Sequence, residues 1–291
     1  MTGRAIFESD IPSWSTPTTL QSRLDRWCLA GFDTVILQVD DGHGATWSTT
    51  AWGLDARVAP SALSTAVTAI HARGLRVVAC VSLAAYNPSF SYYSDLRLTN
   101  FSSPFYNFWS GEFRSRRLQM LFDLSTSCDV DGIALDYLRT GREALGDEIP
   151  AASLLTAWLT QVRVAISPGV PLFGVHHSSY ASGAVREGVA LASWLNASLL
   201  DASILFNYDN PFNAAHLLAL AHTTPKPIWA LLGNYDWLNN APAIRSGLVL
   251  AQLWRRVVRD AHPAAVGVYL ANLLTDEQVA ALPAVHRSLE V

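Results

Sequence analysis

Short apolar segments alternate with longer amphipathic segments along the whole chain. The apolar segments have the length of single strands and cover residues 5–7, 32–39, 75–81, 132–135, 172–175, 202–206, 228–232 and 265–270. A strand that is covered on both faces reads as such a run rather than as a strict alternation. The segments between them carry apolar residues at helical spacing, at 18–30, 61–73, 112–127, 151–166, 186–195, 213–222, 242–260 and from 275 onward.

Eight strands that alternate with eight helices predict parallel strands joined by crossover helices. In 291 residues this pattern predicts an α/β fold, a closed (β/α)8 TIM barrel that forms a single domain over residues 1–291. A doubly wound open sheet is the alternative, but none of the glycine-rich loops that bind nucleotide phosphates follows any strand. In a barrel of this kind the active site lies at the carboxyl ends of the strands.

Ionisable and amide side chains gather where the predicted strands end. These positions carry Glu8, Asp10, Asp40, Asp41, Asp136, Asp209 and Asp236, with His176, His177, Asn207, Asn234 and Asn272. The ordinary alternative for such an acid is a cap on the next helix, which is the better interpretation of Asp10 and Asp41. Asp136 differs because Gly132 and Ala134 precede it on the same strand face, as in a crowded barrel interior, and no helix starts immediately after it.

Carboxylates that face one another across a cavity are the groups that glycoside hydrolysis requires. One acid protonates the leaving oxygen, and the second attacks or stabilises the oxocarbenium-like centre or activates water. Aromatic rings add flat apolar surfaces with polar edges, which match the C–H faces of sugars. The aromatic-rich segment 83–110 and Trp47, Trp52 and Trp237 are candidates, although a single ring more often belongs to a core.

The segment from Asp131 to Arg139, DGIALDYLR, resembles the fourth-strand signature DGI-x-x-D-Y-x-R of glycosidase-like TIM-barrel families. Its opening is also similar to that of the family 18 chitinases, whose strand reads DGxDxDxE. Ala134 and Leu138 stand where that motif has its middle Asp and its Glu, so chitinase chemistry is not expected. The resemblance implies a sugar-acting barrel in which Asp136 holds the catalytic aspartate position.

The second acid is chosen by comparing strand ends. Several retaining glycosidases of this fold take a nucleophilic Asp from strand four and an acid/base Asp from strand six. By that analogy Asp136 is the nucleophile and Asp209 the general acid/base. Asp236 is the substitute because it repeats the Asn-Tyr-Asp context of Asp209, and Asp40 is the third choice. The predicted substrate-binding residues are Asp40, Trp47, Tyr137, Arg139, His176, Tyr208, Asp236 and Trp237.

The sequence therefore predicts a cofactor-independent glycosidase that cleaves O-glycosidic bonds in a polysaccharide or oligosaccharide. A non-catalytic carbohydrate-binding barrel is the alternative, because no Glu follows any strand after the first. A metal-dependent hydrolase is a third hypothesis, based on His176 and His177. Adjacent residues on a strand point to opposite faces, so both cannot bind one metal, and no metal site is expected.

Composition and charge limit the partners. A net charge of −4 without a basic stripe argues against nucleic acid. Cys28, Cys80 and Cys128 lack CxxC spacing, so we expect neither disulfides nor zinc, but thiols packed as small hydrophobes. No signal-peptide core and no run of 18 apolar residues occurs, so no membrane partner is expected; a cytoplasmic protein, or one released by lysis, fits equally. A charged fraction of 15% is compatible with homo-oligomer contacts.

Overall fold

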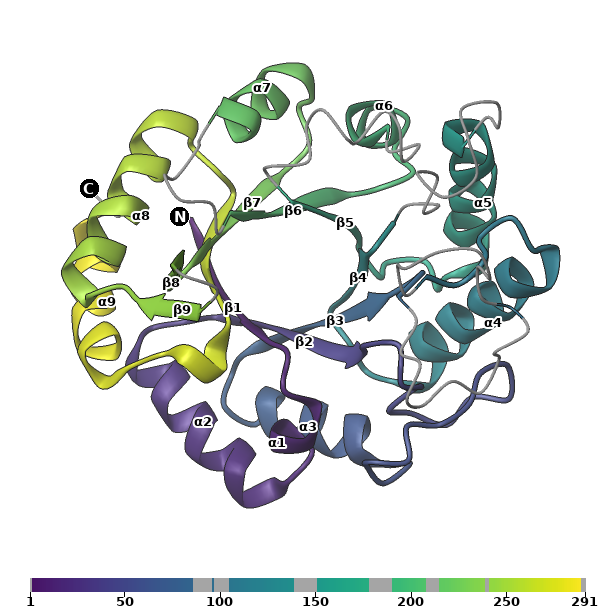
Figure 1. Cartoon of the computed structure of the whole chain (residues 1–291), viewed down its shortest axis with the longest axis horizontal. Helices are drawn as coiled ribbons and strands as arrows, with labels where there is room; N and C mark the ends of the chain where they lie inside the picture. The colour runs from purple at the N-terminus through teal and green to yellow at the C-terminus, as the bar shows by residue number, and fades with distance from the viewer. Residues whose placement is uncertain are drawn as a thin grey trace.

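The computed structural model describes residues 2–85, 96, 105–138, 151–177, 190–207, 215–238 and 241–288. Eight parallel strands form a closed barrel in the order β1-β10-β7-β6-β5-β4-β3-β2, and helices surround it (Figure 1). The barrel strands are β1 (Gly3–Glu8), β2 (Thr34–Asp40), β3 (Arg76–Ser82), β4 (Gly132–Asp136), β5 (Leu172–His177), β6 (Ala202–Asn207), β7 (Ile228–Gly233) and β10 (Ala265–Tyr269). The predicted (β/α)8 barrel is thus confirmed.

Most helices follow the predicted segments with small changes at their ends, whereas the short helix at residues 11–14 and the 3₁₀ turn at 271–273 lie where no helix was predicted. They are α1 (Ile11–Trp14), α2 (Pro17–Leu29), α3 (Ala62–His71), α4 (Gly111–Ser127), α5 (Ala151–Ala165), α6 (Leu191–Asn196), α7 (Ala215–Thr223), α8 (Gly247–Ala261), the 3₁₀ turn η4 (Ala271–Leu273) and α9 (Asp276–Ser288). None of the helices in the described ranges has both the length and the apolar character needed to cross a bilayer.

One helix boundary is predicted wrongly. Residues 242–244, expected at the start of a helix, belong instead to β9 (Ala241–Ile244), which pairs antiparallel with β8 (Tyr235–Leu238). Helix α8 begins only after Ser246, whose Oγ accepts a hydrogen bond from the N–H of Val249 (3.3 Å). The Ser246 side chain thus satisfies an amide that would otherwise lack a partner in the first turn.

The predicted start of the last helix is confirmed. The N–H of Gln278 donates to Thr275 Oγ1 (3.2 Å), and the N–H of Thr275 donates to Gln278 Oε1 (3.1 Å). This reciprocal pair is a capping box.

Alternate residues of the barrel strands separate an inner core from an outer one. In β4, Ala134 belongs to the cluster inside the barrel, while Ile133 and Leu135 belong to the cluster between the barrel and its helices. Gly132 lies on the inner side, where an added Cβ would come within 2.7 Å of the Phe173 ring. The predicted small-residue face of this strand therefore looks into a crowded barrel interior.

Closure of the barrel requires a glycine in β10. A Cβ added to Gly267 would lie 2.4 Å from the carbonyl oxygen of Ala5 in β1 and 2.9 Å from Leu231 Cγ in β7. Because the nearest atom belongs to the backbone of the neighbouring strand, it cannot move away without disturbing the pairing of β1 with β10.

We expect Gly267→Ala to lower the free energy of unfolding by about 1–3 kcal/mol, the usual effect of an overpacked core. Urea denaturation would measure the loss. Gly111→Ala is the matched control, because the nearest atom to its added Cβ, Arg114 Nη2, lies at an ordinary 3.9 Å. Equal stability of the two variants would show that the β1–β10 junction has more room than the structure indicates.

The three thiols differ in burial. Cys80 and Cys128 are buried as predicted, but Cys28 is exposed, so its assignment to the core is wrong. Burial raises the pKa of Cys128 to about 11 and that of Cys80 well above its usual value.

Since the thiolate is the reactive form, Ellman's reagent at pH 8 should modify one thiol in the native chain and three after denaturation. Fast labelling of two or three native thiols would contradict this burial.

Candidate functional site

Asp136 ends β4 on the inner side of the barrel. It follows Ala134 by two residues, and it is opposite Ser82 in the pairing of β4 with β3. Asp136 also acts electrostatically on Cys80 in the inner core. Burial is the main cause of the raised pKa of Cys80, and the negative charge of Asp136 raises that pKa further. The half-buried Asp136 side chain thus lies at the carboxyl-end mouth of the barrel.

The backbone around Asp136 is held in a defined shape. The N–H of Tyr137 donates to Asp136 Oδ1 (2.7 Å), and the N–H of Leu83 donates to the Asp136 carbonyl oxygen (2.9 Å). Tyr137 has a φ of +51°, in the left-handed region that side chains other than glycine seldom adopt. The chain therefore turns sharply after Asp136, which leaves the Tyr137 side chain 37% exposed.

Asp40 does not enter this mouth. Gln38 pairs with Cys80, but the next paired residue, Asp40, faces Val81, so the register slips at this point. Such a bulge re-aims a side chain, and here it turns Asp40 outward with Val81, which belongs to the outer core. The carboxylate is fully buried in an ion pair with Arg117 of α4. This geometry argues against the predicted role of Asp40 in substrate binding.

The buried pair instead ties the ends of β2 and β3 to helix α4. The Arg117 guanidinium lies 4.0 Å from the centre of the Trp52 ring and donates to the Ser82 carbonyl oxygen (3.4 Å). Gln38 Nε2 donates to the Asp40 carbonyl oxygen (2.6 Å) and to Ser82 Oγ (2.9 Å). Burial raises the pKa of Asp40, although the charge of Arg117 opposes this. Ser82 lies opposite the candidate acid of β4, so this network supports the site without touching a substrate.

Glu8 at the end of β1 also points away from the mouth. Its side chain is fully buried and pairs with Arg23 of α2, which in addition donates to Asp10 Oδ2 (3.3 Å). Burial is the main cause of the raised pKa of Glu8, and Arg23 opposes it. Asp10 caps α1 by accepting from the N–H of Ser13 (3.3 Å), as the capping interpretation predicts.

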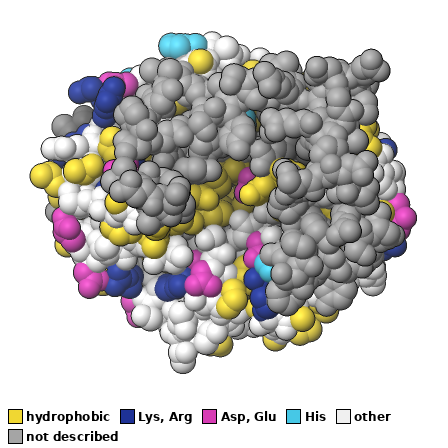
Figure 2. All heavy atoms as spheres, in the orientation of Figure 1, with side chains coloured by type: hydrophobic (Ala, Val, Ile, Leu, Met, Phe, Trp, Pro, Cys, Tyr) yellow, Lys and Arg dark blue, Asp and Glu magenta, His cyan; other side chains and the backbone are white. Residues whose placement is uncertain are grey.

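Three aromatic rings line the inner side of the barrel at its carboxyl end. The Phe7 ring lies 5.2 Å from Tyr269 in a stacked arrangement and 5.0 Å from Phe206, and Phe206 lies 4.6 Å from Tyr269. We call Phe7, Phe206 and Tyr269 the aromatic wall. It lies on β1, β6 and β10, and Tyr269 is its half-buried member. The view down the barrel in Figure 2 shows hydrophobic side chains at its centre with acidic ones beside them.

Sequence reasoning missed the aromatic wall because it looked for sugar platforms in loops. The alternation of side chains along β1, β6 and β10 could have identified these rings, since it places them on the inner face of the barrel. Trp47 and Trp52 are instead 2% and 4% exposed and belong to the outer core. The burial of Trp47 argues against its predicted contact with a sugar.

His176 lies on the side of β5 that faces the helices. It shares that side with Gly174, where an added Cβ would lie 2.7 Å from Leu200 Cδ1. His176 is 8% exposed. Its predicted contact with a sugar hydroxyl does not fit this position. The described residues contain no group of three or more His, Cys, Asp or Glu side chains that could hold a metal ion.

Asp236 lies in the hairpin that follows β7. Its carboxylate pairs with Arg245, and the Asp236 side chain is 29% exposed. Arg245 also donates to the Gly233 carbonyl oxygen (2.6 Å). The charge of Asp236 is thus balanced at the base of the hairpin. Trp237 belongs to β8, but its side chain lies outside the described residues, as do Arg139, Tyr208 and Asp209.

No family model and no curated protein matches this sequence. Similar solved structures include the PgaB (BpsB) glycoside hydrolase domain from Bordetella bronchiseptica, with 13% identity and a TM-score of 0.69, covering 100% of this chain and 99% of that one. The endo-1,4-β-mannanase from Rhizomucor miehei has 10% identity and a TM-score of 0.70, with coverage of 99% and 95%.

A third similar structure is the α-L-fucosidase isoenzyme 2 from Paenibacillus thiaminolyticus, with 11% identity and a TM-score of 0.68 over 100% of this chain. This chain spans only 49% of that protein's length. At such low identities the likeness shows the fold alone. These structural neighbours are TIM-barrel glycoside hydrolases.

We expect Arg117→Met to lower the free energy of unfolding by about 3–5 kcal/mol, because it leaves Asp40 buried without its partner. Arg116→Met, which removes a partly exposed pair with Glu112, should cost less than about 1 kcal/mol. The double variant Asp40→Leu/Arg117→Met should regain part of the loss, since both charges are then absent. Chemical denaturation would test this, and equal losses in all three variants would contradict it.

Proposed function

We propose that this chain is a glycoside hydrolase that cleaves O-glycosidic bonds in a polysaccharide or oligosaccharide, with residues 1–291 forming one glycosidase-like barrel. The observation that carries the proposal is Asp136, a carboxylate on an inward-facing strand position at the mouth of a barrel whose opposite side bears the aromatic wall. The fold supports it, because its structural neighbours include chitinases, mannanases and a fucosidase.

In this proposal Asp136 acts as the nucleophile or as the carboxylate that stabilises the oxocarbenium-like transition state. The hydrogen bond from the N–H of Tyr137 to Asp136 Oδ1 (2.7 Å) suits an ionised carboxylate with a fixed orientation. Asp209 is the proposed general acid/base by analogy with retaining glycosidases, and Asp236 is its substitute. The substitute would first have to exchange its ion pair with Arg245 for a contact with the leaving oxygen.

Substrate contacts are proposed for Tyr137 and Tyr269, which the fold leaves near the mouth, and for three residues that the sequence alone suggests. Tyr137 is exposed beside Asp136, and Arg139, Tyr208 and Trp237 keep the roles that the sequence predicts for them. Tyr269 joins them, because it is the half-buried member of the aromatic wall and its ring can cover the C–H face of a sugar. Asp40, Trp47 and His176 are left out because they are buried on the outer side of the barrel.

A carbohydrate-binding barrel without catalysis is the second candidate, and one observation favours it. Among the described residues, Asp136 is the only carboxylate on an inward-facing position of a barrel strand, since Glu8 and Asp40 are turned toward the helices. Hydrolysis needs two carboxyl groups at the scissile bond. The glycoside hydrolase therefore requires Asp209 or Asp236 to supply the second carboxyl group, whereas the carbohydrate-binding barrel requires neither.

We expect Asp136→Asn and Asp209→Asn each to lower kcat on a cleaved polysaccharide by roughly 10²–10⁴-fold, the usual contribution of a positioned acid or base. Asp129→Asn is the control, because its side chain is 97% exposed before β4, at the opposite end of that strand. Reducing-sugar release from a polysaccharide panel would be measured on variants with unchanged thermal unfolding.

The outcomes separate the two candidates. Full activity in Asp136→Asn would rule out the proposed site. Activity that survives Asp209→Asn but not Asp236→Asn would move the acid/base role to the hairpin after β7. Binding to a glycan array without release of any product from the unmodified chain would favour the non-catalytic barrel.

A further inference from the structure

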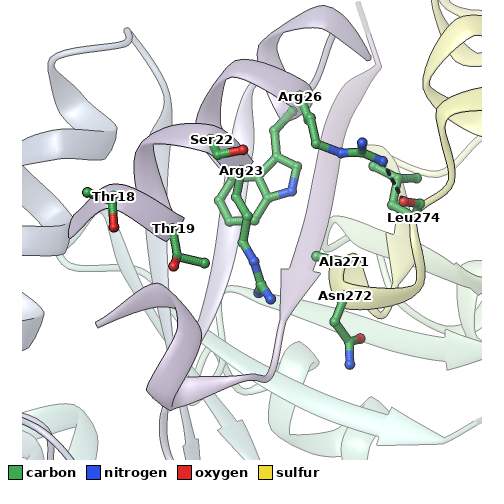
Figure 3. A pocket seen from close by; sticks show the side chains of 9 residues that line it. Thr18, Thr19, Ser22, Arg23, Arg26, Ala271, Asn272 and Leu274 are labelled. Atoms are coloured by element: carbon green, nitrogen blue, oxygen red, sulfur yellow. Dashed lines mark hydrogen bonds between the residues drawn. The ribbon is translucent and has the colours of Figure 1, made fainter. Parts of the chain in front are cut away.

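A polar pocket of about 440 Å³ lies outside the barrel ring, between α2 and the turn η4 that follows β10. It is therefore at the carboxyl end, beside the seam where β1 and β10 close the barrel. Its polar lining consists of Thr18, Thr19, Ser22, Arg23, Arg26 and Asn272. Figure 3 shows Arg23 extending into the space between Thr19 and Asn272. None of the residues in the proposed catalytic site lines this pocket.

Arg23 is held rigidly at the pocket wall. It donates one hydrogen bond to the fully buried Glu8 and another to Asp10 Oδ2 (3.3 Å), and its side chain is 18% exposed. A guanidinium has five N–H groups, so these two bonds fix its orientation without using all its donors. A donor that is already oriented loses little entropy when it binds a ligand.

The charges around the pocket argue against an anionic ligand. Arg26 pairs with Asp276 and donates to the Leu274 carbonyl oxygen (2.7 Å), and Arg23 pairs with Glu8 and Asp10. Two guanidinium groups thus stand beside three carboxylates, which leaves no excess of positive charge. Hydroxyl groups of Thr and Ser and the amide of Asn both donate and accept hydrogen bonds. A neutral ligand with many hydroxyl groups fits this mixture better than a phosphate or sulfate does.

The pocket also lies in a suitable place relative to Asp136. In the ring of eight strands β10 is four positions from β4, so the two are on opposite sides. Strands about 4.7–4.9 Å apart make such a ring roughly 15 Å across. The aromatic wall lies on β1 and β10, the strands beside the pocket, and on β6. A single sugar at Asp136 is too short to span this separation, whereas a chain of several sugars is long enough.

We infer that this pocket binds a neutral sugar residue of a chain whose other part lies at Asp136. The inference rests on the proposed function and deepens it, because it makes an oligosaccharide or polysaccharide chain the substrate rather than a single sugar or a disaccharide. A pocket of this size is in the usual range for small-ligand sites. Arg23 donates to the sugar, Asn272 both donates and accepts, and the hydroxyl groups of α2 complete the contacts.

The test fills the pocket and varies the length of the ligand. Asp136→Asn serves as the background in which chains are bound but not cleaved, and Ser22→Trp is added to it, because Ser22 is exposed on α2 and its enlargement occupies the space. Ser64→Trp is the matched control, at an exposed position of α3 that does not line this pocket. Calorimetric titrations use cellohexaose, mannohexaose and N-acetylchitohexaose, their disaccharides, and inorganic phosphate.

We expect Ser22→Trp to weaken binding of the recognised hexasaccharide about tenfold, which corresponds to the loss of one or two hydrogen bonds. Asn272→Ala should weaken it in the same direction, while Ser64→Trp should leave it unchanged. Disaccharide binding should be equal in all variants, because a disaccharide at Asp136 does not reach the pocket.

Each other result overturns a defined part of the inference. A hexasaccharide that binds Ser22→Trp as tightly as its background removes the pocket from the substrate path and leaves the proposed function standing. Phosphate binding that Ser22→Trp abolishes replaces the neutral sugar by an anion and overturns the assignment. If the unmodified chain neither binds nor cleaves any of the three hexasaccharides, the proposed function itself fails, and the pocket assignment fails with it.

Discussion

Pairing of β1 with β10 is the contact on which this structure depends. It joins residues near the two ends of the sequence in parallel register, from Gly3 with Ala265 to Phe7 with Tyr269. Without a side chain at Gly267 the strands can approach closely enough to form it, since a Cβ there would clash with the backbone of β1. The same junction stacks the Phe7 and Tyr269 rings and brings α2 beside η4. The aromatic wall and the polar pocket are both consequences of closing the ring.

Alternation of side chains, with one interruption, decides which acids reach the barrel mouth. In β4 the regular alternation carries Asp136 inward behind Ala134. In β1 the same alternation sends Glu8 outward, to Arg23. In β2 the bulge before Asp40 reverses the side to which that carboxylate points and delivers it to Arg117. Three acids at strand ends therefore have different surroundings, although the sequence presents them in the same way.

The outward acids have structural roles that differ in kind from catalysis. A buried ion pair contributes little net stability, because the desolvation of both charges offsets their attraction. It does fix positions, since a single partner left alone in the core is very costly. The pair of Asp40 and Arg117 holds β2 and α4 together next to Ser82, and Arg23 of α2 holds Glu8 and Asp10 at the end of β1. Rigid strand ends of this kind are what a catalytic carboxylate needs from its surroundings.

The sequence alone determined the fold class and the position of Asp136. Runs of buried apolar residues and helical periods are local patterns, so eight strand–helix units could be counted along the chain and assembled into a barrel. The small residues Gly132 and Ala134 similarly marked the inner face of β4 before any contact was known. The capping box at Thr275 was readable for the same reason, because both of its partners lie within four residues.

Only the tertiary structure decided the surroundings of the other candidate residues. The bulge that turns Asp40 outward depends on pairing with β3, and the burial of Trp47 and His176 depends on how the chain packs around them. The hairpin that replaces the start of α8 depends on cross-strand pairing of residues 235–244. The pocket at the β1–β10 seam joins segments about 250 residues apart. Such features come from contacts between distant segments, and local periodicity carries no information about those contacts.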